Sequence, residues 1–504
     1  MSGFPLLTIL TVFPLLGACV ALVSGERARR VAQAVGLLAL VGALVVWFNI
    51  PQDGSIGLTE SFAWVPSLGI DYHLGVDGLG GLMVLLSAVV VLMSLGATKK
   101  KLAQPGLYYA LVLALEAGLF GAFTALNFFH WFIFWELSLI PAFFLVKLWG
   151  GPGRSAAGTQ FFVYTMAGSV ALLLGFLAVS YATGTMDFLK LAELAHSGEL
   201  VKAIHLHLGG VETILAVGVL AGFAVKVPLM PFHTWLPDAY AEAPSAVTML
   251  LTGAMSKMGV YGLLRIALPI FGEQIAAMRT PLLVLATLTV VMGAWAAVAQ
   301  KDLKRVFAYS SVNHLGYCLL AIFALALPAS GTQVASQAAA LNGVILQMLN
   351  HGLTAAALFW YVAILEQRTG GQRNLADFGG LRKTAPVLAG LMGIALFSSL
   401  GLPGLNGFVG EFLIFRGVFP LSWVAGTVSA LGLLVTAAVI LTVIERVFAG
   451  PVSGASVEFA DLNGAERLAL APVAALMLLL GLLPQLIVGV INPTVLNLLA
   501  HWRF

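Results

Sequence analysis

Long apolar runs recur along almost the whole chain, and short polar stretches separate them. A helix needs roughly 20 apolar residues to cross a bilayer core of about 30 Å, and lipid would leave the backbone groups of an open strand unsatisfied. The pattern therefore predicts an all-α, polytopic membrane protein with about 14 transmembrane helices. The runs centre near residues 13, 40, 86, 117, 138, 171, 225, 257, 290, 316, 352, 403, 436 and 479.

Composition supports this prediction, because 60% of the 504 residues are hydrophobic and only 9% are charged. Soluble domains carry about 25% charged residues, so a water-soluble enzyme is excluded. The net charge of +3 is too small and too dispersed for a protein that binds nucleic acid. The expected surroundings are a lipid bilayer, with no nucleic-acid partner.

The sequence carries no motif that would hold a redox centre. Cys19 and Cys318 are far apart, and the chain has no C-x-x-C motif, no G-x-G-x-x-G motif and no P-loop. Iron–sulfur and zinc sites need clustered Cys or His ligands. We therefore expect no cofactor and no metal in this chain, and no redox chemistry of its own.

The distribution of Lys and Arg predicts the orientation, because basic residues near span ends stay on the cytoplasmic side. With the N-terminus outside, 17 of the 25 basic residues fall in inner loops. These are Arg27, Arg29, Arg30, Lys99, Lys100, Lys101, Lys147, Arg154, Lys301, Lys304, Arg305, Arg368, Arg373, Arg382, Lys383, Arg446 and Arg467. The first run has no basic start, so it is expected to remain as a span. Both termini are predicted on the outer side.

Two apolar runs are interrupted by similar stretches, AVKVPLMPF with Pro228 and Pro231, and SLGLPGLNG with Pro403, Gly404 and Gly407. Their first prolines are 175 residues apart, and the same offset carries the fourth run onto the ninth. Five spans per copy is an odd number, so the two copies would be inverted relative to each other. The alternative is that two proline kinks among many helices are ordinary. We favour inverted repeats with broken helices 7 and 12.

This repeat divides the chain into four predicted parts. An N-terminal segment of three helices covers 1–105, and a C-terminal helix covers 451–504. The first five-helix repeat would cover 106–275, and the second, inverted repeat would cover 276–450.

Several predicted spans contain an ionisable residue. At a helix centre such a residue costs about 2.5 to 3.5 kcal/mol on insertion scales, so it usually faces a polar interior and a partner. The candidates are Glu116, Glu136, Lys226, Lys257, His314, His351 and Glu411. Together they predict a chain of groups that carries protons, with water entering where the helices are broken.

Some of these residues also fit a structural role. Glu116 lies near the start of its apolar run, which is equally compatible with an interfacial position. His314 and His351, taken singly, are typical of core histidines bonded to carbonyl groups. Lys147 and Arg265 stand near span ends, where snorkelling or pairing is favoured.

Glu136 and Lys226 form a candidate switch. At an assumed separation of ~6 Å and an effective dielectric constant of ~20, opposite charges attract by about 3 kcal/mol. With the acid near, Lys226 is expected to hold its proton, and with the acid moved or neutralised, to release it. Lys257 is the expected acceptor, because two nearby ammonium groups repel each other.

Residues 224–265, AVKVPLMPFHTWLPDAYAEAPSAVTMLLTGAMSKMGVYGLLR, resemble the signature of the antiporter-like membrane subunits of respiratory complex I, the NADH:quinone oxidoreductase. Similar subunits occur in cation/proton antiporter complexes and membrane hydrogenases. The resemblance continues in DLKRVFAYSSVNHLGYCLLAIF, LQMLNHGLTAAALFW and GLPGLNGFVGEFLIF. It extends from HLGVDGL at His73 through the thirteenth run, so it covers most of the chain.

Within that family the chain resembles the M type, which is numbered 4 in mitochondria and also has a counterpart in chloroplasts and cyanobacteria. HLGVDGL and NHGLTAAALF are similar to that type, and the second broken helix carries Glu411 where the L and N types carry lysine. The chain also stops soon after its fourteenth run, without the lateral helix of the L type. One departure is a polar insertion at residues 326–337, which lengthens an outer loop.

The resemblance implies a proton-translocating subunit coupled to quinone reduction elsewhere in the complex. Glu136 and Lys226 would be the coupling ion pair, with Lys257 as the central lysine. Glu411 would be the terminal exchange site, and the two histidines would form the relay. FMN, iron–sulfur clusters and quinone are expected on partner subunits. The neighbours would be the L-type and N-type subunits, in a bacterial inner membrane.

Two other functions remain open from the sequence. A subunit of a multisubunit Na⁺/H⁺ antiporter or of a membrane-bound hydrogenase would use the same buried groups. A counterflow assay with and without sodium separates Na⁺ exchange from H⁺ pumping. A purely structural scaffold is the weakest alternative, because it leaves the buried lysines without a role.

Overall fold

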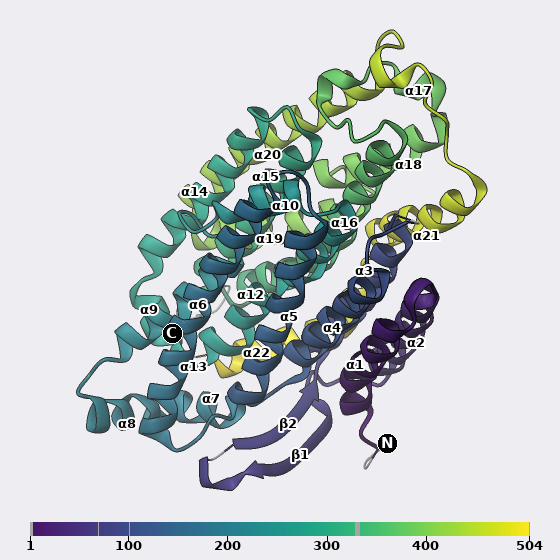
Figure 1. The fold of residues 1–504 in the computed structure, drawn as a ribbon. Coiled ribbons are helices and arrows are strands. Elements are labelled where there is room, and N and C mark those ends of the chain that lie inside the picture. Colours follow the sequence, from purple (N-terminus) through teal and green to yellow (C-terminus); the bar gives the residue numbers. More distant parts are fainter. Residues whose placement is uncertain (1–3, 69, 100, 328–332, 503–504) are drawn as a thin grey trace.

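The computed structural model describes residues 4–68, 70–99, 101–327 and 333–502. Helices run alongside one another through an elongated body, and a two-stranded hairpin lies at one end (Figure 1). The polar insertion expected at 326–337 falls partly on residues 328–332, which lie outside the described residues. The structure confirms the helical prediction and adds one small antiparallel sheet.

The first half of the chain contains six long helices and four shorter ones. The long helices are α1 (Leu6–Val23), α2 (Ala28–Phe48), α3 (Gly78–Ala97), α4 (Pro105–Thr124), α5 (Phe128–Trp149) and α6 (Arg154–Thr183). The shorter helices are α7 (Phe188–Ser197), α8 (Glu199–Leu208), α9 (Glu212–Lys226) and α10 (Trp235–Glu242). The hairpin strands, between α2 and α3, are β1 (Gly57–Val65) and β2 (Ile70–Val76).

The second half begins with one long helix in several segments. These are α11 (Ser245–Leu250), a π-helical segment (Leu251–Met255), α12 (Lys257–Gly262), a second π-helical segment (Leu263–Ala267) and α13 (Leu268–Ala277). There follow α14 (Arg279–Val298), α15 (Leu303–Leu325), α16 (Gln333–Arg368), α17 (Leu381–Thr384), α18 (Pro386–Leu400), α19 (Asn406–Leu421), α20 (Trp423–Val443), α21 (Gly464–Leu482) and α22 (Gln485–His501).

Polar residues between the apolar runs cap several helix starts. The Asp77 carboxylate accepts hydrogen bonds of 3.1 Å from the backbone N–H groups of Leu79 and Gly80 at the start of α3. Asn127 caps α5 in the same way, and Asp302 caps α15. Such caps satisfy N–H groups that a helix start leaves free. The boundaries of the apolar runs therefore coincide with real helix ends.

Twelve helices of the described chain are long and apolar enough to cross a membrane, or up to 13 when a bent helix pair counts as one span. The difference from the expected 14 lies at the predicted breaks. Residues 227–234 separate α9 from α10, and residues 401–405 separate α18 from α19. Each of these four helices has 16 residues or fewer, too short to span alone. The count of 14 and the inverted repeat stay predictions.

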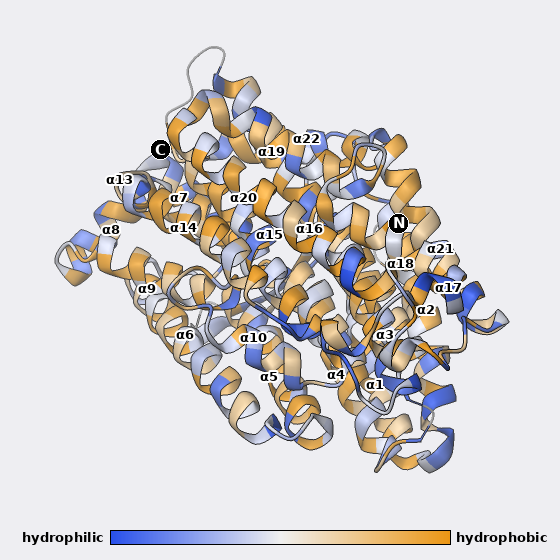
Figure 2. Cartoon of the chain, turned by 90° about the horizontal axis from the view of Figure 1, so that it is seen from above, coloured by the Kyte–Doolittle hydropathy of each residue, from blue (hydrophilic) through white to orange (hydrophobic). Residues whose placement is uncertain are grey.

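The helices divide into an inner and an outer set. The most apolar stretches of α16 and of the helix at 245–277 are completely buried within the chain. By contrast, α1, α20 and α21 leave most of their side chains at least partly exposed, including Leu431 and Leu434 of α20. Hydrophobic residues run along these peripheral helices as well as the inner ones (Figure 2). The outer set thus presents apolar surface to a bilayer, and the inner set can hold polar side chains.

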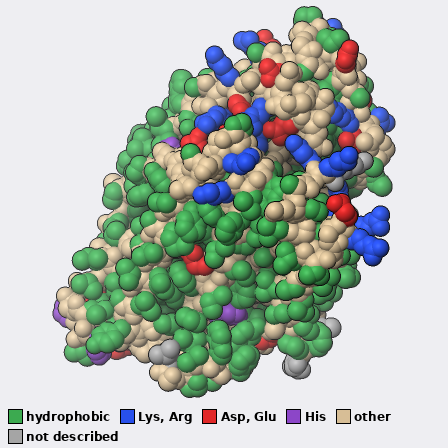
Figure 3. All heavy atoms as spheres, in the orientation of Figure 1, with side chains coloured by type: hydrophobic (Ala, Val, Ile, Leu, Met, Phe, Trp, Pro, Cys, Tyr) green, Lys and Arg blue, Asp and Glu red, His purple; other side chains and the backbone are tan. Residues whose placement is uncertain are grey.

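The two ends of the body differ in charge. Lys and Arg gather at the end opposite the hairpin (Figure 3). At the hairpin end, the Leu7 N–H of α1 donates to Glu60 of β1 at 2.6 Å, and Asn497 of α22 donates to the Gly54 carbonyl at 3.2 Å. Both ends of the described chain therefore lie at the hairpin end, in agreement with an even number of crossings.

Residues 451–504, expected to hold one C-terminal helix, contain α21 and α22. Pro484 stands between them, and a proline at that point lacks the N–H that would continue the helix. α22 packs against α3 and α16 at the hairpin end, where Thr494 accepts a hydrogen bond of 3.0 Å from the Gly78 N–H.

Asp187 ties the hairpin to α7. Its carboxylate lies 2.5 Å from His73 Nδ1 of β2 and accepts hydrogen bonds from the backbone N–H groups of Leu189 and Lys190. Burial opposes ionisation of this carboxyl, but the hydrogen bonds from His73 and Lys190 outweigh it. The pKa of Asp187 therefore lies below its ordinary value.

Asp187→Ala is expected to destabilise the hairpin and α7 by about 1–3 kcal/mol, because it removes a helix cap and leaves His73 unpaired. Hydrogen exchange of the α7 amides measures the effect, with Asp53→Ala in an exposed loop at the same end as control. Since folding lowers the pKa, the stabilisation is present above the unfolded value of ~3.9 and is lost as the pH falls below it. Unchanged exchange at neutral pH would contradict this role.

Candidate functional site

Lys257 is completely buried, on a helix distorted by two π-helical segments. A π-helical turn changes the backbone hydrogen-bonding pattern, and such turns are frequent at functional sites. Here Lys257 Nζ donates to the carbonyl oxygen of Thr252, five residues earlier, at 2.5 Å. Nζ also lies 2.7 Å from His351 Nδ1 of α16. The distorted helix thus places the lysine against one of the two predicted histidines.

The two histidines connect this lysine to Glu411. The ring centroids of His351 and His314 are 5.4 Å apart. His314 Nδ1 lies 3.0 Å from Glu411 Oε1, and His314 Nε2 lies 3.2 Å from Ser399 Oγ. Gln347 Nε2 donates to Glu411 Oε1 at 3.3 Å. Four predicted residues therefore form one chain of contacts across α12, α16, α15 and α19, which we call the central chain.

A small cavity lies along the central chain. Its volume is about 20 Å³, which is enough for about one water molecule. Its polar walls come from four helices, α15, α16, α18 and α19. They are Ser310, Ser311, His314, Gln347, Asn350, His351, Thr354, Ser398, Ser399 and Glu411. A water molecule here would find the several polar partners that it needs.

The second predicted break separates α18 from α19. Pro403 lacks an N–H donor, and Gly404 has φ 94°, a conformation that favours glycine. Gly407 lies in the first turn of α19, where an added Cβ would be 1.9 Å from the Ser398 carbonyl oxygen. Only glycine allows the two half-helices to come so close. Glu411 follows one turn later and is buried.

The first predicted break separates α9 from α10 and contains Pro228 and Pro231. The backbone N–H before Pro231 donates to Thr289 Oγ1 of α14 at 3.0 Å. The indole N–H of Trp235 donates to the Val225 carbonyl at 3.0 Å. Neighbouring groups of the protein thus satisfy backbone groups that the break leaves free, as lipid could not.

Lys226 ends α9 beside this break and is 3% exposed. Its Nζ lies 4.6 Å from the centre of the Trp135 ring and makes no hydrogen bond with any described residue. Glu136, next to this tryptophan on α5, is half-buried, and its charge acts on Lys226 without an ion pair within 4 Å among the described residues. The coupling of Glu136 and Lys226, expected at a separation of ~6 Å, stays a prediction. The aromatic face holds the ammonium group.

α9 packs closely on α12, which carries Lys257. An added Cβ at Gly259 would be 3.2 Å from Lys226 Cβ and 2.4 Å from Val227 Cγ2. Because residue 259 has no side chain, α12 can pack directly against the end of α9.

Glu116 lies apart from the central chain, on α4. It is completely buried, and neither of its carboxylate oxygens has a hydrogen-bond partner among the described residues. Its place in the middle of the 20-residue helix favours a buried position over an interfacial one, and its role stays a prediction. α4 packs against α1, α3 and α5.

Arg265 forms an ion pair, one of the two arrangements that the sequence predicted for it near a span end. Its guanidinium forms an ion pair with the buried Asp77 carboxylate, which also caps α3. It lies two helical turns beyond Lys257, toward the hairpin end.

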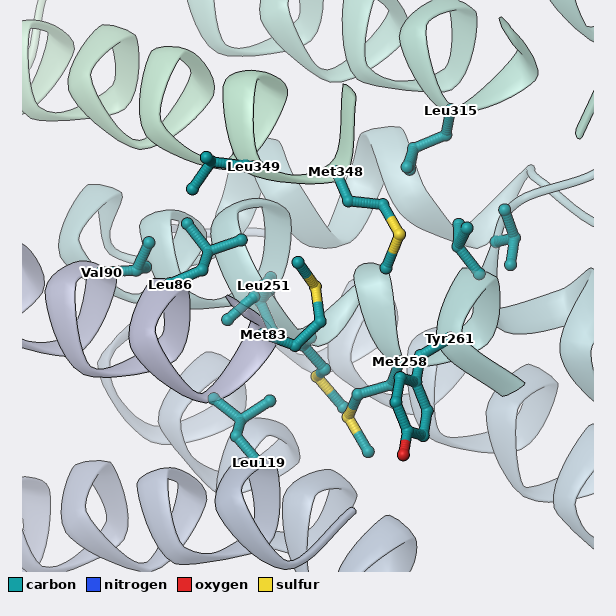
Figure 4. Close-up of a cluster of buried hydrophobic side chains, with 14 of the residues drawn as sticks. Met83, Leu86, Val90, Leu119, Leu251, Met258, Tyr261, Leu315, Met348 and Leu349 are labelled. Carbon is teal, nitrogen blue, oxygen red and sulfur yellow. The ribbon is translucent and has the colours of Figure 1, made fainter. Parts of the chain in front are cut away.

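Apolar side chains from three other helices pack around Met258 and Tyr261 of this helix. Met83 of α3, Leu119 of α4 and Met348 of α16 belong to the same buried cluster as Met258 and Tyr261 (Figure 4). Flexible methionine side chains fill irregular space, so they leave little room for water.

Gln347, Asn350 and Thr354 were not singled out by the sequence analysis. They share a helix face with His351, because their spacing in QMLNHGLT is three and four residues. That spacing of polar residues inside an apolar run was the available signal. Trp135 had no such signal, because aromatic residues are common in apolar runs.

Comparisons with known proteins agree with this architecture. A family model described as NADH:quinone oxidoreductase/Mrp antiporter, transmembrane, matches residues 125–440. NADH-quinone oxidoreductase subunit M of Rhodobacter capsulatus is 35% identical, over 99% of this chain and 97% of its own. A chain of respiratory complex I from Thermus thermophilus with bound NADH has a TM-score of 0.85 and 27% identity, covering 99% of this chain and 100% of that chain.

The fold is shared more widely. A chain of the Mrp complex from Dietzia sp. DQ12-45-1b has a TM-score of 0.83 at 24% identity, covering 98% of each chain. At that identity the likeness shows the fold alone. The full-length match to subunit M confirms the predicted M-type resemblance. This chain belongs to the NADH:quinone oxidoreductase/Mrp antiporter family of transmembrane proteins.

Proposed function

We propose that this chain is the M-type proton-translocating subunit of a complex I-type NADH:quinone oxidoreductase. It would move H⁺ through buried side chains while quinone is reduced elsewhere in the complex. The observation that carries the proposal is the central chain, in which Lys257, His351, His314 and Glu411 follow one another inside the molecule. Relatives named subunit M support the assignment to this complex.

The chemistry of these groups suits proton transfer. A neutral imidazole accepts a proton on one nitrogen and donates from the other. A neutral Lys257 amine would take up a proton and pass it to His351, and the second histidine would pass it to Glu411. Water in the small cavity bridges the wider gaps between these groups.

Lys226 would act as the switch for this transfer. Its ammonium group rests on the Trp135 ring rather than in a closed ion pair, so a small movement of Glu136 toward or away from it alters the local charge. Attraction between opposite charges depends steeply on distance and on the effective dielectric constant. Signals from neighbouring subunits could enter the chain at this point.

The remaining assignments follow from the same family. FMN, iron–sulfur clusters and quinone would be on partner subunits, and the neighbours would include the L-type and N-type subunits. The chain would lie in a bacterial inner membrane with both termini outside. The two inverted repeats, 106–275 and 276–450, would place the two breaks in corresponding positions.

Glu411→Gln is expected to lower NADH-driven proton pumping about tenfold or more, because glutamine keeps the shape and cannot carry the proton. Pumping is measured in inverted membrane vesicles that contain the whole complex. Glu458→Gln, in an exposed loop, is the matched control. Repeating the assay with and without sodium separates H⁺ pumping from Na⁺ exchange. Pumping at the parental rate in Glu411→Gln would refute the proposed role of Glu411 as the terminal exchange site.

A further inference from the structure

A second polar cavity lies at the end of the molecule where Lys and Arg gather (Figure 3). Its volume is about 220 Å³, which is room for several water molecules. Glu366 of α16, Ser245 of α11 and Lys304 of α15 line it. Lys304 is 2% exposed, although the sequence places it in a basic stretch between two spans. We call this space the inlet cavity.

Glu366 is held between the inlet cavity and the protein interior. Its Oε2 accepts a hydrogen bond of 2.6 Å from Ser245 Oγ, and its Oε1 accepts one of 3.3 Å from Arg373. Lys304 Nζ lies 3.9 Å from Glu366 Oε1 and donates to the Ala243 carbonyl at 2.5 Å. The carboxylate side chain keeps 15% of its surface exposed, so it reaches both water and buried hydroxyl groups.

Buried hydroxyl groups lead from Glu366 toward Lys257. Ser245, Thr248 and Thr252 follow at spacings of three and four residues, on one side of their helix, and all three are buried. Thr252 Oγ1 lies 3.1 Å from Ser311 Oγ of α15. The Thr252 carbonyl in turn accepts the hydrogen bond from Lys257 Nζ. These side chains, which we call the hydroxyl row, lie between Glu366 and Lys257. Thr248 Oγ1 donates to the Tyr240 carbonyl at 3.0 Å, so the steps between the hydroxyl groups need intervening water.

The opposite direction along the same helix is more apolar. A cavity of about 420 Å³ at the hairpin end reaches Arg265 and Asp77. Tyr261 lies one turn from each of Lys257 and Arg265, is fully buried, and belongs to the apolar cluster of Figure 4. Its hydroxyl donates to a backbone carbonyl of α4 at 3.2 Å, and beyond its ring lies the Arg265 guanidinium, which keeps its proton. Lys257 thus has buried hydroxyl groups on the side of the inlet cavity, and Tyr261, Arg265 and apolar side chains on the side of the hairpin.

We propose that Glu366 and Lys304 form the inlet through which protons reach Lys257 from the Lys- and Arg-rich end. The inference rests on the proposed function. Glu366 takes a proton from water in the inlet cavity and passes it, through the hydroxyl row and intervening water, to the neutral Lys257 amine. The transfer restores the carboxylate and produces the ammonium. Lys304 is a positioning residue, which holds the carboxylate between cavity and interior.

Glu366→Gln in the whole complex tests this inlet. The variant keeps the hydrogen bonds to Ser245 and is expected to lower NADH-driven pumping about tenfold or more. Added formate is a small acid that fits the inlet cavity and can deliver a proton there. It should therefore raise the pumping rate of Glu366→Gln several-fold. Glu366→Asp should retain most of the activity. A merely structural glutamate would show no rescue by formate.

Asp238→Asn is the matched control, since Asp238 pairs with Arg305 at 2.6 Å on the same end of the molecule. A surface pair of this kind contributes about 0–1 kcal/mol, so pumping should not change. Should Glu366→Gln prevent assembly, Ser245→Ala gives the second test, because it removes the hydroxyl bonded to Glu366 Oε2, and a loss of about threefold or more is expected at normal assembly. Pumping at the parental rate in assembled Glu366→Gln or Ser245→Ala overturns the inlet, and so does a loss in Glu366→Gln that formate does not rescue.

The same vesicles separate the two proposals. If Lys257 variants stop pumping while Glu366→Gln pumps at the parental rate, the inlet is wrong and the proposed function stands. If Lys257 variants also pump at the parental rate, the proposed function itself fails.

Discussion

Lys257→Met is expected to lower NADH-driven proton translocation about 100-fold or more, with the complex still assembled. Methionine has a similar length and fits an apolar helix without the insertion cost of a charge, so the packing of α12 should persist. It cannot bind a proton, and it removes the contact with His351 at the start of the central chain. Proton pumping and NADH oxidation are measured together in inverted vesicles.

Lys257→Arg tests whether the charge of Lys257 is enough or whether it must also release a proton, and Lys202→Met is the control. Lys257→Arg keeps a positive charge but does not release its proton, so it should also fail to pump. Lys202→Met removes an exposed lysine of α8 and should pump normally. Pumping by Lys257→Arg at the parental rate would mean that charge alone is needed. The relay through the central chain would then be wrong.

Gly407→Ala is expected to destabilise the protein by about 3 kcal/mol or more, because the new Cβ would stand 1.9 Å from the Ser398 carbonyl oxygen. The new Cβ and the Ser398 carbonyl oxygen are both fixed to the backbone, so neither can turn away as a flexible side chain would. The half-helices α18 and α19 would have to separate, and Glu411 would leave His314. Thermal unfolding of the purified complex and its pumping rate measure the two consequences.

Gly390→Ala and Gly393→Ala provide matched controls on α18. An added Cβ at either position meets no atom within 4 Å, so the change should be neutral or stabilise the helix by up to about 1 kcal/mol. Equal melting temperatures for Gly407→Ala and these controls would contradict the close approach at the break.

The helices were predictable because lipid imposes a strong rule on sequence. Each span needs about 20 apolar residues, and the polar residues between spans then supply caps such as Asp77. The breaks were predictable for a related reason. Pro228 and Pro403 interrupt apolar runs where helices would otherwise continue, and the structure shows two helix ends at each.

The candidate residues were visible in the sequence because a charge or histidine in an apolar run stands out. Their contacts were not visible, because they join helices far apart along the chain. The sequence named Glu136 as the partner of Lys226, and the structure adds the contact of that ammonium group with the Trp135 ring, which no sequence pattern indicated. Glu366 also escaped notice, because it lies in the last turns of α16, where a charge near a span end is ordinary.

Sequence alone thus determined that the chain crosses a membrane many times, where two spans are broken, and which buried side chains can carry charge. Only the tertiary structure decided which of those side chains meet. Hydrophobic patterning specifies which residues avoid water, but the neighbour of a buried lysine depends on how α12, α15, α16 and α19 pack. That packing follows from close contacts at residues such as Gly407, and no local pattern encodes the partner across the contact.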